Sequence, residues 1–258
     1  MRNIFIITIL LSLFSSPSWS ETLSMDDLVM RNNLYYKKFT DVPFTGEIFG
    51  LENGRFKNGE LEGFWKYHYK NGQLRNKGNY KDGKKDGLWE TYYEDGKLSS
   101  NRNYKNGKRD GLWETYYEDG QLSRKFNYKN NKLDDLWETY YEDGQLKEKG
   151  NYKDYKRDGL WETYYEDGKL SSNRNYKNGK RDGLWETYYE DGQLSRKFNY
   201  KNNKLDDLWE TYHKNGQLKE KGNYKDYKRE GPWETYYEDG KLSSCLLYTS
   251  DAADDLYR

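Results

Sequence analysis

The side chains that most often carry out chemistry are scarce in this sequence. It has one cysteine, Cys245, and two histidines, His68 and His213, and none has a second such residue at zinc-ligand spacing. The repeated Glu-Asp-Gly and Lys-Asp-Gly triplets resemble calcium loops, but no run supplies the converging oxygens and the bidentate glutamate that calcium requires. We therefore predict no metal site and no cofactor, and we interpret the triplets as turns.

Paired carboxylates are the other candidates for chemistry, since they can act as general acid and base. Glu90 and Glu94 are typical, and they lie in a segment that is rich in lysine. A solvated face shared with lysines does not desolvate a carboxyl group, so its pKa is not moved toward acid catalysis. We predict no catalytic residue and no enzymatic activity.

The composition directs attention to aromatic side chains instead. The 258 residues include 28 Tyr, 9 Trp and 9 Phe, whereas Ile and Val are absent after Ile48. Any buried surface beyond that point must therefore be mainly aromatic. Because 44 Lys and Arg balance 44 Asp and Glu, no net charge would attract nucleic acid or acidic membranes, and we predict no nucleic-acid partner.

Tryptophan recurs every 24 residues, which indicates stacked supersecondary units. The series consists of Trp65, Trp89, Trp113, Trp137, Trp161, Trp185, Trp209 and Trp233. Asp95-Gly96 and Asn106-Gly107 separate strand-forming runs, and such pairs favour the type I′ turns of β-hairpins. The sequence predicts an all-β fold, an elongated single-layer antiparallel meander of about eight hairpins of about 24 residues.

Alternation along each strand assigns the side chains to two faces. A two-residue loop at Asp95-Gly96 would pair Trp89 with Arg102 and Tyr93 with Leu98. The other face is mostly polar. The aromatic face of this unit is predicted to carry Trp89, Thr91, Tyr93, Leu98, Ser100, Arg102 and Tyr104.

The connection between units decides whether the tryptophans stay in one column. A four-residue connection over residues 106–109 would place Tyr104 opposite Gly111 and Arg102 opposite Trp113, which keeps the column in register. Arginine over an indole would form a cation–π contact. The residues that face the tryptophans then cycle in the order Arg102, Phe126, Gly150, Arg174, Phe198 and Gly222.

The elements G-x-W-x-x-Y-Y-x-x-G-x-L and N-Y-K-[ND]-G-K-x-x-G resemble the bacterial variant of the MORN repeat, found in proteins catalogued as YwqK-type toxin–antitoxin antitoxins. The resemblance covers about residues 44–244, and residues 34–50 look like a capping half-repeat. It implies an elongated sheet used for interaction, without catalytic residues. The sequence departs from the pattern where Asp135 and Asp207 replace Gly and where Tyr155 and Tyr227 stand in the turn.

Four segments are predicted along the chain. Residues 1–20 have the anatomy of a signal peptide: Arg2, an apolar run and the triplet Ser18-Trp19-Ser20. The apolar run of about 11 residues is shorter than the roughly 20 that span a bilayer, so we predict no transmembrane segment in the mature chain. Residues 21–60 form a lead-in and capping half-repeat, and residues 61–244 form the hairpin repeats.

The last segment, residues 245–258, does not follow the repeat and resembles a translated transposon-type sequencing adapter, so we predict that it is an artefact. A longer period lies above the 24-residue one. Residues 161–232 repeat residues 89–160 with five differences, at positions 141/213, 142/214, 143/215, 158/230 and 160/232. This is a recent duplication or an assembly error, so agreement between the two copies says little about selection.

The aromatic face is the feature that could bind a partner, because a single-layer sheet leaves one face uncovered. The candidate residues are Trp89, Tyr93, Arg102, Tyr104, Trp113, Tyr117, Phe126, Trp137, Trp161, Tyr165, Trp185, Tyr189, Phe198 and Trp209. We predict a non-enzymatic protein, exported to the periplasm or the cell surface, that acts as a protein-interaction scaffold in the bacterial envelope. The alternatives are an antitoxin or immunity protein and a cell-surface glycan-binding module.

Overall fold

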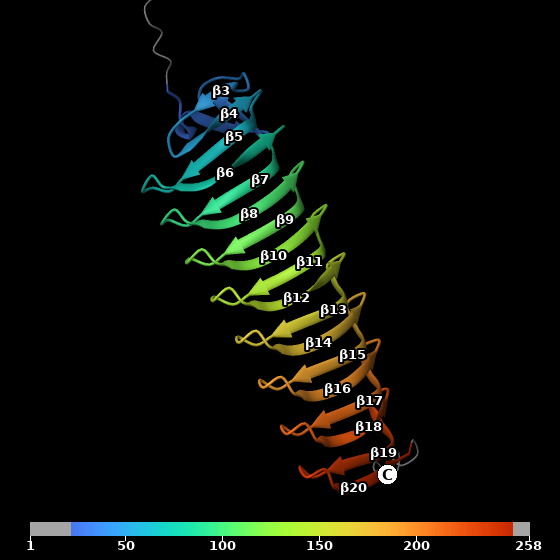
Figure 1. Ribbon diagram of the computed structural model, residues 1–258. Coiled ribbons are helices and arrows are strands. Elements are labelled where there is room, and N and C mark those ends of the chain that lie inside the picture. The colour runs from blue at the N-terminus through green and yellow to red at the C-terminus, as the bar shows by residue number, and fades with distance from the viewer. Residues whose placement is uncertain (1–21, 250–258) are drawn as a thin grey trace, which may run out of the picture.

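The computed structural model describes residues 22–249, and they form an elongated array of antiparallel strands with almost no other structure (Figure 1). Each strand pairs with the strands before and after it in sequence, so the sheet is an antiparallel meander from β3 to β20. The single-layer all-β fold predicted from the sequence is confirmed. The two end strands lie at opposite ends of the array (Figure 1).

The elements follow one another as short strands. A 3-10 helix η1 (Met25–Asp27) comes first. The strands are β1 (Leu28–Arg31), β2 (Leu34–Lys37), β3 (Gly46–Ile48), β4 (Glu52–Lys57), β5 (Glu60–His68), β6 (Leu74–Lys81), β7 (Lys84–Tyr92), β8 (Leu98–Lys105), β9 (Lys108–Tyr116), β10 (Leu122–Lys129), β11 (Lys132–Tyr140), β12 (Leu146–Lys153), β13 (Lys156–Tyr164), β14 (Leu170–Lys177), β15 (Lys180–Tyr188), β16 (Leu194–Lys201), β17 (Lys204–Tyr212), β18 (Leu218–Lys225), β19 (Lys228–Tyr236) and β20 (Leu242–Tyr248).

The turn at the Asn-Gly pairs is the predicted type I′. Asn106 and Gly107 have φ of 50° and 78°, and Lys105 pairs with Lys108 across them. Tyr155 occupies the second position of the equivalent turn with φ of 65°, so this turn type survives a bulky residue there.

The turn at the Asp-Gly pairs differs from the prediction. Only Gly96 has a positive φ, of 88°, and its N–H donates to the Tyr93 carbonyl at 3.0 Å while Tyr93 N–H donates to the Lys97 carbonyl at 2.8 Å. This is a three-residue loop with glycine at its left-handed position. As a result Leu98 pairs with Tyr92, and the predicted pairing of Leu98 with Tyr93 is wrong.

The tryptophan column is in register, but by a different route from the predicted four-residue connection. Tyr104 pairs with Arg109 next to the two-residue turn, and the register then shifts so that Arg102 pairs with Trp113. A bulge of two residues in β9 therefore does what a longer loop was expected to do. Tyr104 is not opposite Gly111; it pairs with Gly87 of the preceding strand.

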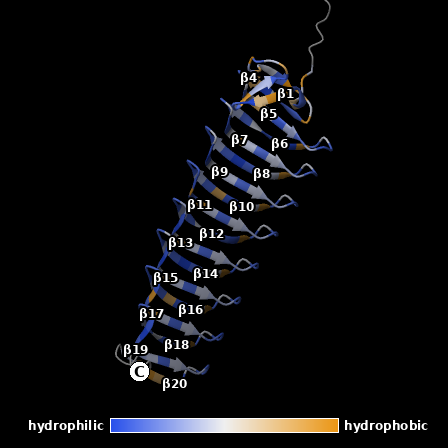
Figure 2. Ribbon diagram, turned by 180° about the vertical axis from the view of Figure 1, so that it is seen from behind, coloured by the Kyte–Doolittle hydropathy of each residue, from blue (hydrophilic) through white to orange (hydrophobic). Residues whose placement is uncertain are grey.

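The array is capped at its N-terminal end by a small apolar core. The hairpin of β1 and β2 lies there, and Leu28, Ile48 and Phe56 are buried together with Trp65 and Trp89. Within the described residues, Ile and Val occur only at this end of the array, where hydrophobic segments gather (Figure 2). None of the helices within residues 22–249 is long and apolar enough to cross a membrane. The predicted signal peptide lies outside the described residues.

The predicted boundary at residue 245 falls inside β20. Leu246 pairs with Trp233 and Tyr248 pairs with Gly231, so the start of the unusual C-terminal segment continues the sheet. Residues 250–258 lie outside the described part, and the artefact interpretation stays a prediction.

Candidate interaction surface

Aromatic rings form a nearly continuous row along one face of the sheet. Neighbouring ring centroids lie between 4.8 and 6.4 Å apart, most of them edge-to-face or tilted. From Tyr104 the row runs through Trp113, Phe126, Trp137, Tyr152, Trp161, Tyr176, Trp185, Phe198, Trp209, Tyr224, Trp233 and Tyr248. The rings therefore pack largely on each other, which is how a single layer without Ile or Val buries surface.

The predicted cycle of residues facing the tryptophans is confirmed by the strand register. Trp89 pairs with Arg102, Trp113 with Phe126, and Trp137 with Gly150. The second copy repeats the order, with Trp161 opposite Arg174, Trp185 opposite Phe198 and Trp209 opposite Gly222.

The residue on the preceding strand divides the tryptophans into two classes. We call Trp65, Trp89, Trp161 and Trp233 the glycine-backed tryptophans, because Gly54, Gly78, Gly150 and Gly222 lie directly against their indoles. A Cβ at Gly150 would stand 2.3 Å from Cδ2 of Trp161, so only glycine allows the ring to lie so close to the backbone. All four are buried, with exposed fractions of 0 to 3%.

The other four tryptophans follow Arg or Phe on the preceding strand and are only half-buried. Arg102 precedes Trp113, and Phe126 precedes Trp137. The second copy repeats both arrangements with Arg174 before Trp185 and Phe198 before Trp209. Each copy therefore has three aromatic side chains side by side on three neighbouring strands, which we call a Trp–Phe–Trp cluster. The first cluster consists of Trp113, Phe126 and Trp137, and the second of Trp185, Phe198 and Trp209.

Cations cover three of the four glycine-backed indoles, and they come from positions that the sequence prediction had placed in the connection. Lys85, Arg157 and Arg229 lie 4.1, 4.0 and 4.0 Å from the rings of Trp89, Trp161 and Trp233. Burial, with a smaller effect of nearby Arg102, lowers the pKa of the Lys85 ammonium group. The predicted contact of Arg102 with an indole also exists, at the longer distance of 5.3 Å from Trp113.

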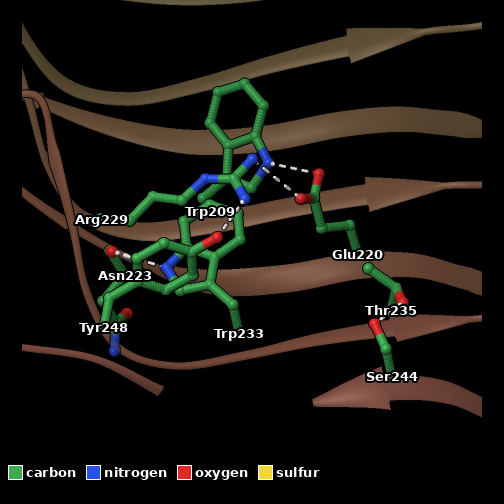
Figure 3. Close-up of polar contacts among 8 residues, drawn as sticks. All are labelled: Trp209, Glu220, Asn223, Arg229, Trp233, Thr235, Ser244 and Tyr248. Atoms are coloured by element: carbon green, nitrogen blue, oxygen red, sulfur yellow. Dashed lines mark hydrogen bonds and ion pairs between the residues drawn. The ribbon is translucent and has the colours of Figure 1, made fainter. Parts of the chain in front are cut away.

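The C-terminal repeats show how these cations are held (Figure 3). Arg229 donates to Glu220 at 3.2 Å and to the Tyr248 hydroxyl at 3.2 Å while it covers Trp233. Trp209 N–H donates to the other Glu220 oxygen at 3.4 Å. Glu220 therefore links a glycine-backed tryptophan's cation to the half-buried tryptophan of the preceding unit.

Four tyrosines of the predicted site connect successive hairpins instead of joining the row of rings. Tyr93 lies just beyond β7, and its hydroxyl donates to the Tyr116 carbonyl at 2.6 Å. Tyr117, Tyr165 and Tyr189 make the same contact with Tyr140, Tyr188 and Tyr212. In the second copy His213 replaces the tyrosine and its Nε2 lies 3.0 Å from the Tyr236 carbonyl.

The opposite face carries a polar lattice. Glu–Tyr pairs two residues apart recur on it, for example Tyr212 donating to Glu210 at 2.7 Å, and lysines such as Lys149 pair with Glu162 at 2.7 Å. Burial, together with the hydrogen bond to Glu210, raises the pKa of Tyr212 to about 12. No group of three His, Cys, Asp or Glu side chains within residues 22–249 could hold a metal ion.

The repeat geometry defines an antiparallel hairpin-repeat protein, and comparison with known protein families agrees with it. The MORN repeat variant family matches residues 61–82, 85–106, 109–130, 136–154, 157–178, 181–202, 208–226 and 229–249. The chain therefore belongs to the MORN repeat variant family. The two shorter matches begin after Asp134-Asp135 and Asp206-Asp207, where the sequence departs from the usual glycine.

More distant comparisons add little. No curated protein matches the sequence. Among solved structures, the crystal structure of TcdB2-TccC3 matches with a TM-score of 0.19 and 13% sequence identity, and the match covers 72% of this chain and 13% of that one. This chain spans only a small part of the other, and a likeness this weak bears on neither fold nor function.

Proposed function

We propose that the protein is a non-enzymatic, exported interaction scaffold of the bacterial envelope that binds a protein partner through the aromatic face. The observation that carries this proposal is the pair of Trp–Phe–Trp clusters, whose four tryptophans are half-buried while Phe198 between two of them is buried. Tryptophan, tyrosine and arginine are the side chains most enriched where proteins bind each other, and each cluster has arginine beside it. Arg109 lies 5.8 Å from the Trp113 ring and 4.3 Å from the Tyr128 ring.

The two clusters support bivalent binding. They occupy equivalent places in two 72-residue copies, which are six strands apart, or about 29 Å at 4.8 Å per strand. A partner with two matching sites would gain avidity from engaging both. Export rests on the signal-peptide pattern of residues 1–20, and secretion of a fusion of these residues to a reporter enzyme would test it.

The repeat itself provides the test of binding. Deletion of residues 89–160 leaves residue 88 joined to residue 161, which restores the same local sequence and removes one cluster. We expect a partner recovered from envelope extract by crosslinking to bind the shortened chain about 10²-fold or more weakly, yet still detectably. Circular dichroism should fall in proportion to the lost strands.

A matched control comes from the opposite face. Leu88 and Leu160 are 45% and 46% exposed and precede glycine-backed tryptophans, so they point away from the aromatic face. The double variant Leu88→Ser and Leu160→Ser should retain full binding. Unchanged affinity after the deletion, or loss of binding in the leucine variant, would contradict the proposed surface.

The glycan-binding alternative has one observation in its favour, the half-buried indoles, which could stack on sugar rings. Within the clusters, however, Phe198 and Trp209 already stack on each other at 28°. Titration with peptidoglycan fragments should leave Trp fluorescence unchanged if the protein is a protein scaffold. The antitoxin alternative rests on family resemblance alone, and growth rescue on co-expression with a neighbouring toxin gene would support it.

A further inference from the structure

The loops of the array form two rows along its two long sides (Figure 1). The two-residue turns all lie on one side and the three-residue turns on the other, because the meander alternates between them. Every two-residue turn from β6 onward is flanked by two lysines that pair directly. These pairs, the lysine edge, are Lys81–Lys84, Lys105–Lys108, Lys129–Lys132, Lys153–Lys156, Lys177–Lys180, Lys201–Lys204 and Lys225–Lys228.

The opposite row is acidic. Its three-residue turns carry Glu-Asp-Gly, and we call these carboxylates the acidic edge: Glu94, Asp95, Glu118, Asp119, Glu142, Asp143, Glu166, Asp167, Glu190, Asp191, Glu238 and Asp239. The aspartates stabilise the turns, as Asp95 accepts from Lys97 N–H at 3.0 Å. Lys97, Lys169 and Lys241 each pair with the aspartate of their own turn, and Lys214 with Asn215 interrupts the row.

The lysine edge is unfavourable for the isolated fold. Like charges directly opposite each other on paired strands destabilise a hairpin. The first turn of the array shows that the fold does not need them, because Lys57 there pairs with Glu60. Three lysines of this edge do form ion pairs. The Nζ atoms of Lys132 and Lys204 lie 2.7 and 2.8 Å from carboxylate oxygens of Asp154 and Asp226, and that of Lys225 lies 4.0 Å from Glu230. In residues 22–249 the other lysines of this edge form no ion pair, and all are exposed.

Most glutamates of the acidic edge also form no ion pair; Glu238 differs, because its carboxylate lies 3.8 Å from Nδ1 of His213. Glu118, Glu142, Glu166 and Glu190 are exposed, and their carboxylates form no ion pair with any side chain of the described part. The lysine edge also carries carboxylates, since Asp86, Asp110 and Asp182 accept from backbone N–H groups of its turns, and these oxygens already serve the turns. The exposed side chains left without an ion pair are mainly lysines on one long side of the described array and mainly carboxylates on the other. The charges that form no ion pair within the fold are available for a partner with the opposite pattern.

We propose that the partner of these edges is a second copy of this chain, placed side by side so that the lysine edge of one copy lies along the acidic edge of the next. Both edges repeat once every two strands, about 9.6 Å, so the two rows match in spacing by construction. Each exposed pair contributes little, but the rows offer many pairs at once. This inference does not depend on the proposed aromatic partner.

Charge also fixes the symmetry of the assembly. A two-fold dimer would place like edges together, lysine on lysine or carboxylate on carboxylate. Joining unlike edges is a heterologous contact, which leaves an unused lysine edge and an unused acidic edge at the two sides. The copies should therefore form open rows that grow with concentration, with the aromatic faces presented side by side.

Sedimentation velocity of the full chain tests this at several concentrations in 10 mM and 500 mM NaCl. The Debye length falls from about 30 Å to a few ångströms across this range. We expect the weight-average sedimentation coefficient at low salt to rise with concentration without reaching a plateau, and to return to the monomer value at high salt. A monomer at both salt concentrations, or a closed dimer insensitive to salt, would overturn the proposal.

Matched variants locate the contact. The quadruple variant Glu118→Gln, Glu142→Gln, Glu166→Gln and Glu190→Gln should reduce low-salt association at least tenfold, while the corresponding Glu→Asp variant, which keeps the charges, should associate like the natural chain. Equal behaviour of the two variants would overturn the proposal. Binding of inorganic polyphosphate by a chain that does not self-associate would also overturn the proposal, because the partner of the lysine edge would then be a free polyanion.

Discussion

A glycine-backed repeat and a repeat backed by arginine can have the same sequence around the tryptophan, Gly-Leu-Trp-Glu-Thr-Tyr-Tyr, and yet differ in how far the indole is buried. Trp161 follows Gly150 and is completely buried, whereas Trp185 follows Arg174 and is half-buried. The difference arises one strand away, where the absence of a side chain lets the ring lie on the backbone. A single position in the preceding strand thus decides whether a tryptophan belongs to the core or to the surface.

The two classes of tryptophan have different roles, one in stability and one in forming the accessible surface. The glycine-backed repeats of Trp89, Trp161 and Trp233 recur every third hairpin. In each of them a buried indole with a covering cation packs against the preceding strand and stabilises the contact between units. Between them lie pairs of hairpins whose rings remain partly accessible. The same period therefore sets both the stability of the sheet and the spacing of its candidate binding clusters.

The largest difference between the classes should appear on truncation of the ring. Trp161→Ala removes a completely buried side chain and should destabilise the array by about 3–5 kcal/mol. Trp185→Ala should cost about 1–2 kcal/mol less, because this ring is partly solvated already. Urea denaturation followed by circular dichroism measures both free energies of unfolding. Equal losses would show that the two classes of tryptophan do not differ in their contribution to stability.

The glycine itself gives the next largest effect. Gly150→Ala would bring a Cβ to 2.3 Å from the Trp161 ring, and the resulting displacement should cost about 1–3 kcal/mol. The reverse exchange, Arg174→Gly, makes room behind Trp185. It should shift the emission of that tryptophan to the blue, and an unchanged spectrum would mean that more than the glycine is required.

The covering cation contributes less. Arg157→Gln removes a guanidinium 4.0 Å from the Trp161 ring and should cost about 1 kcal/mol. Arg124 is exposed and makes no described contact, so Arg124→Gln serves as the control and should change stability by less than about 0.5 kcal/mol. Equal effects of the two substitutions would show that the covering cation does not stabilise the buried indole.

The polar face adds a small dependence on pH. The pKa of Tyr212 is raised to about 12, above the value near 10 of an unfolded chain, so the protonated folded form is favoured. The unfolded state loses its proton first, and this contribution is therefore complete below about pH 10 and is lost as the pH rises toward 12. The urea midpoint should fall between about pH 10 and 12, and less steeply in Tyr212→Phe.

Much of this organisation could be predicted from the sequence, and the failures have local causes. The tryptophan period predicted the hairpins, the pairing of Trp89 with Arg102 and the cycle through Arg102, Phe126 and Gly150, because side chains alternate along strands. The Asp-Gly turn could not be predicted, since the same dipeptide suits a two-residue and a three-residue loop. The covering cations Lys85, Arg157 and Arg229 were missed because the bulges after them were taken for longer connections, which removed these residues from their strands.

Hydroxyl-radical footprinting read by mass spectrometry tests the division of the tryptophans most directly. Trypsin releases Trp89 and Trp161 in one peptide, DGLWETYYEDGK, and Trp113 and Trp185 in another, DGLWETYYEDGQLSR, so the duplication keeps the classes separate. The account predicts that the indole of the second peptide is oxidised several-fold faster in the folded protein and equally fast after unfolding. Equal rates in the folded protein would contradict the claim that glycine on the preceding strand decides which tryptophans are available to a partner.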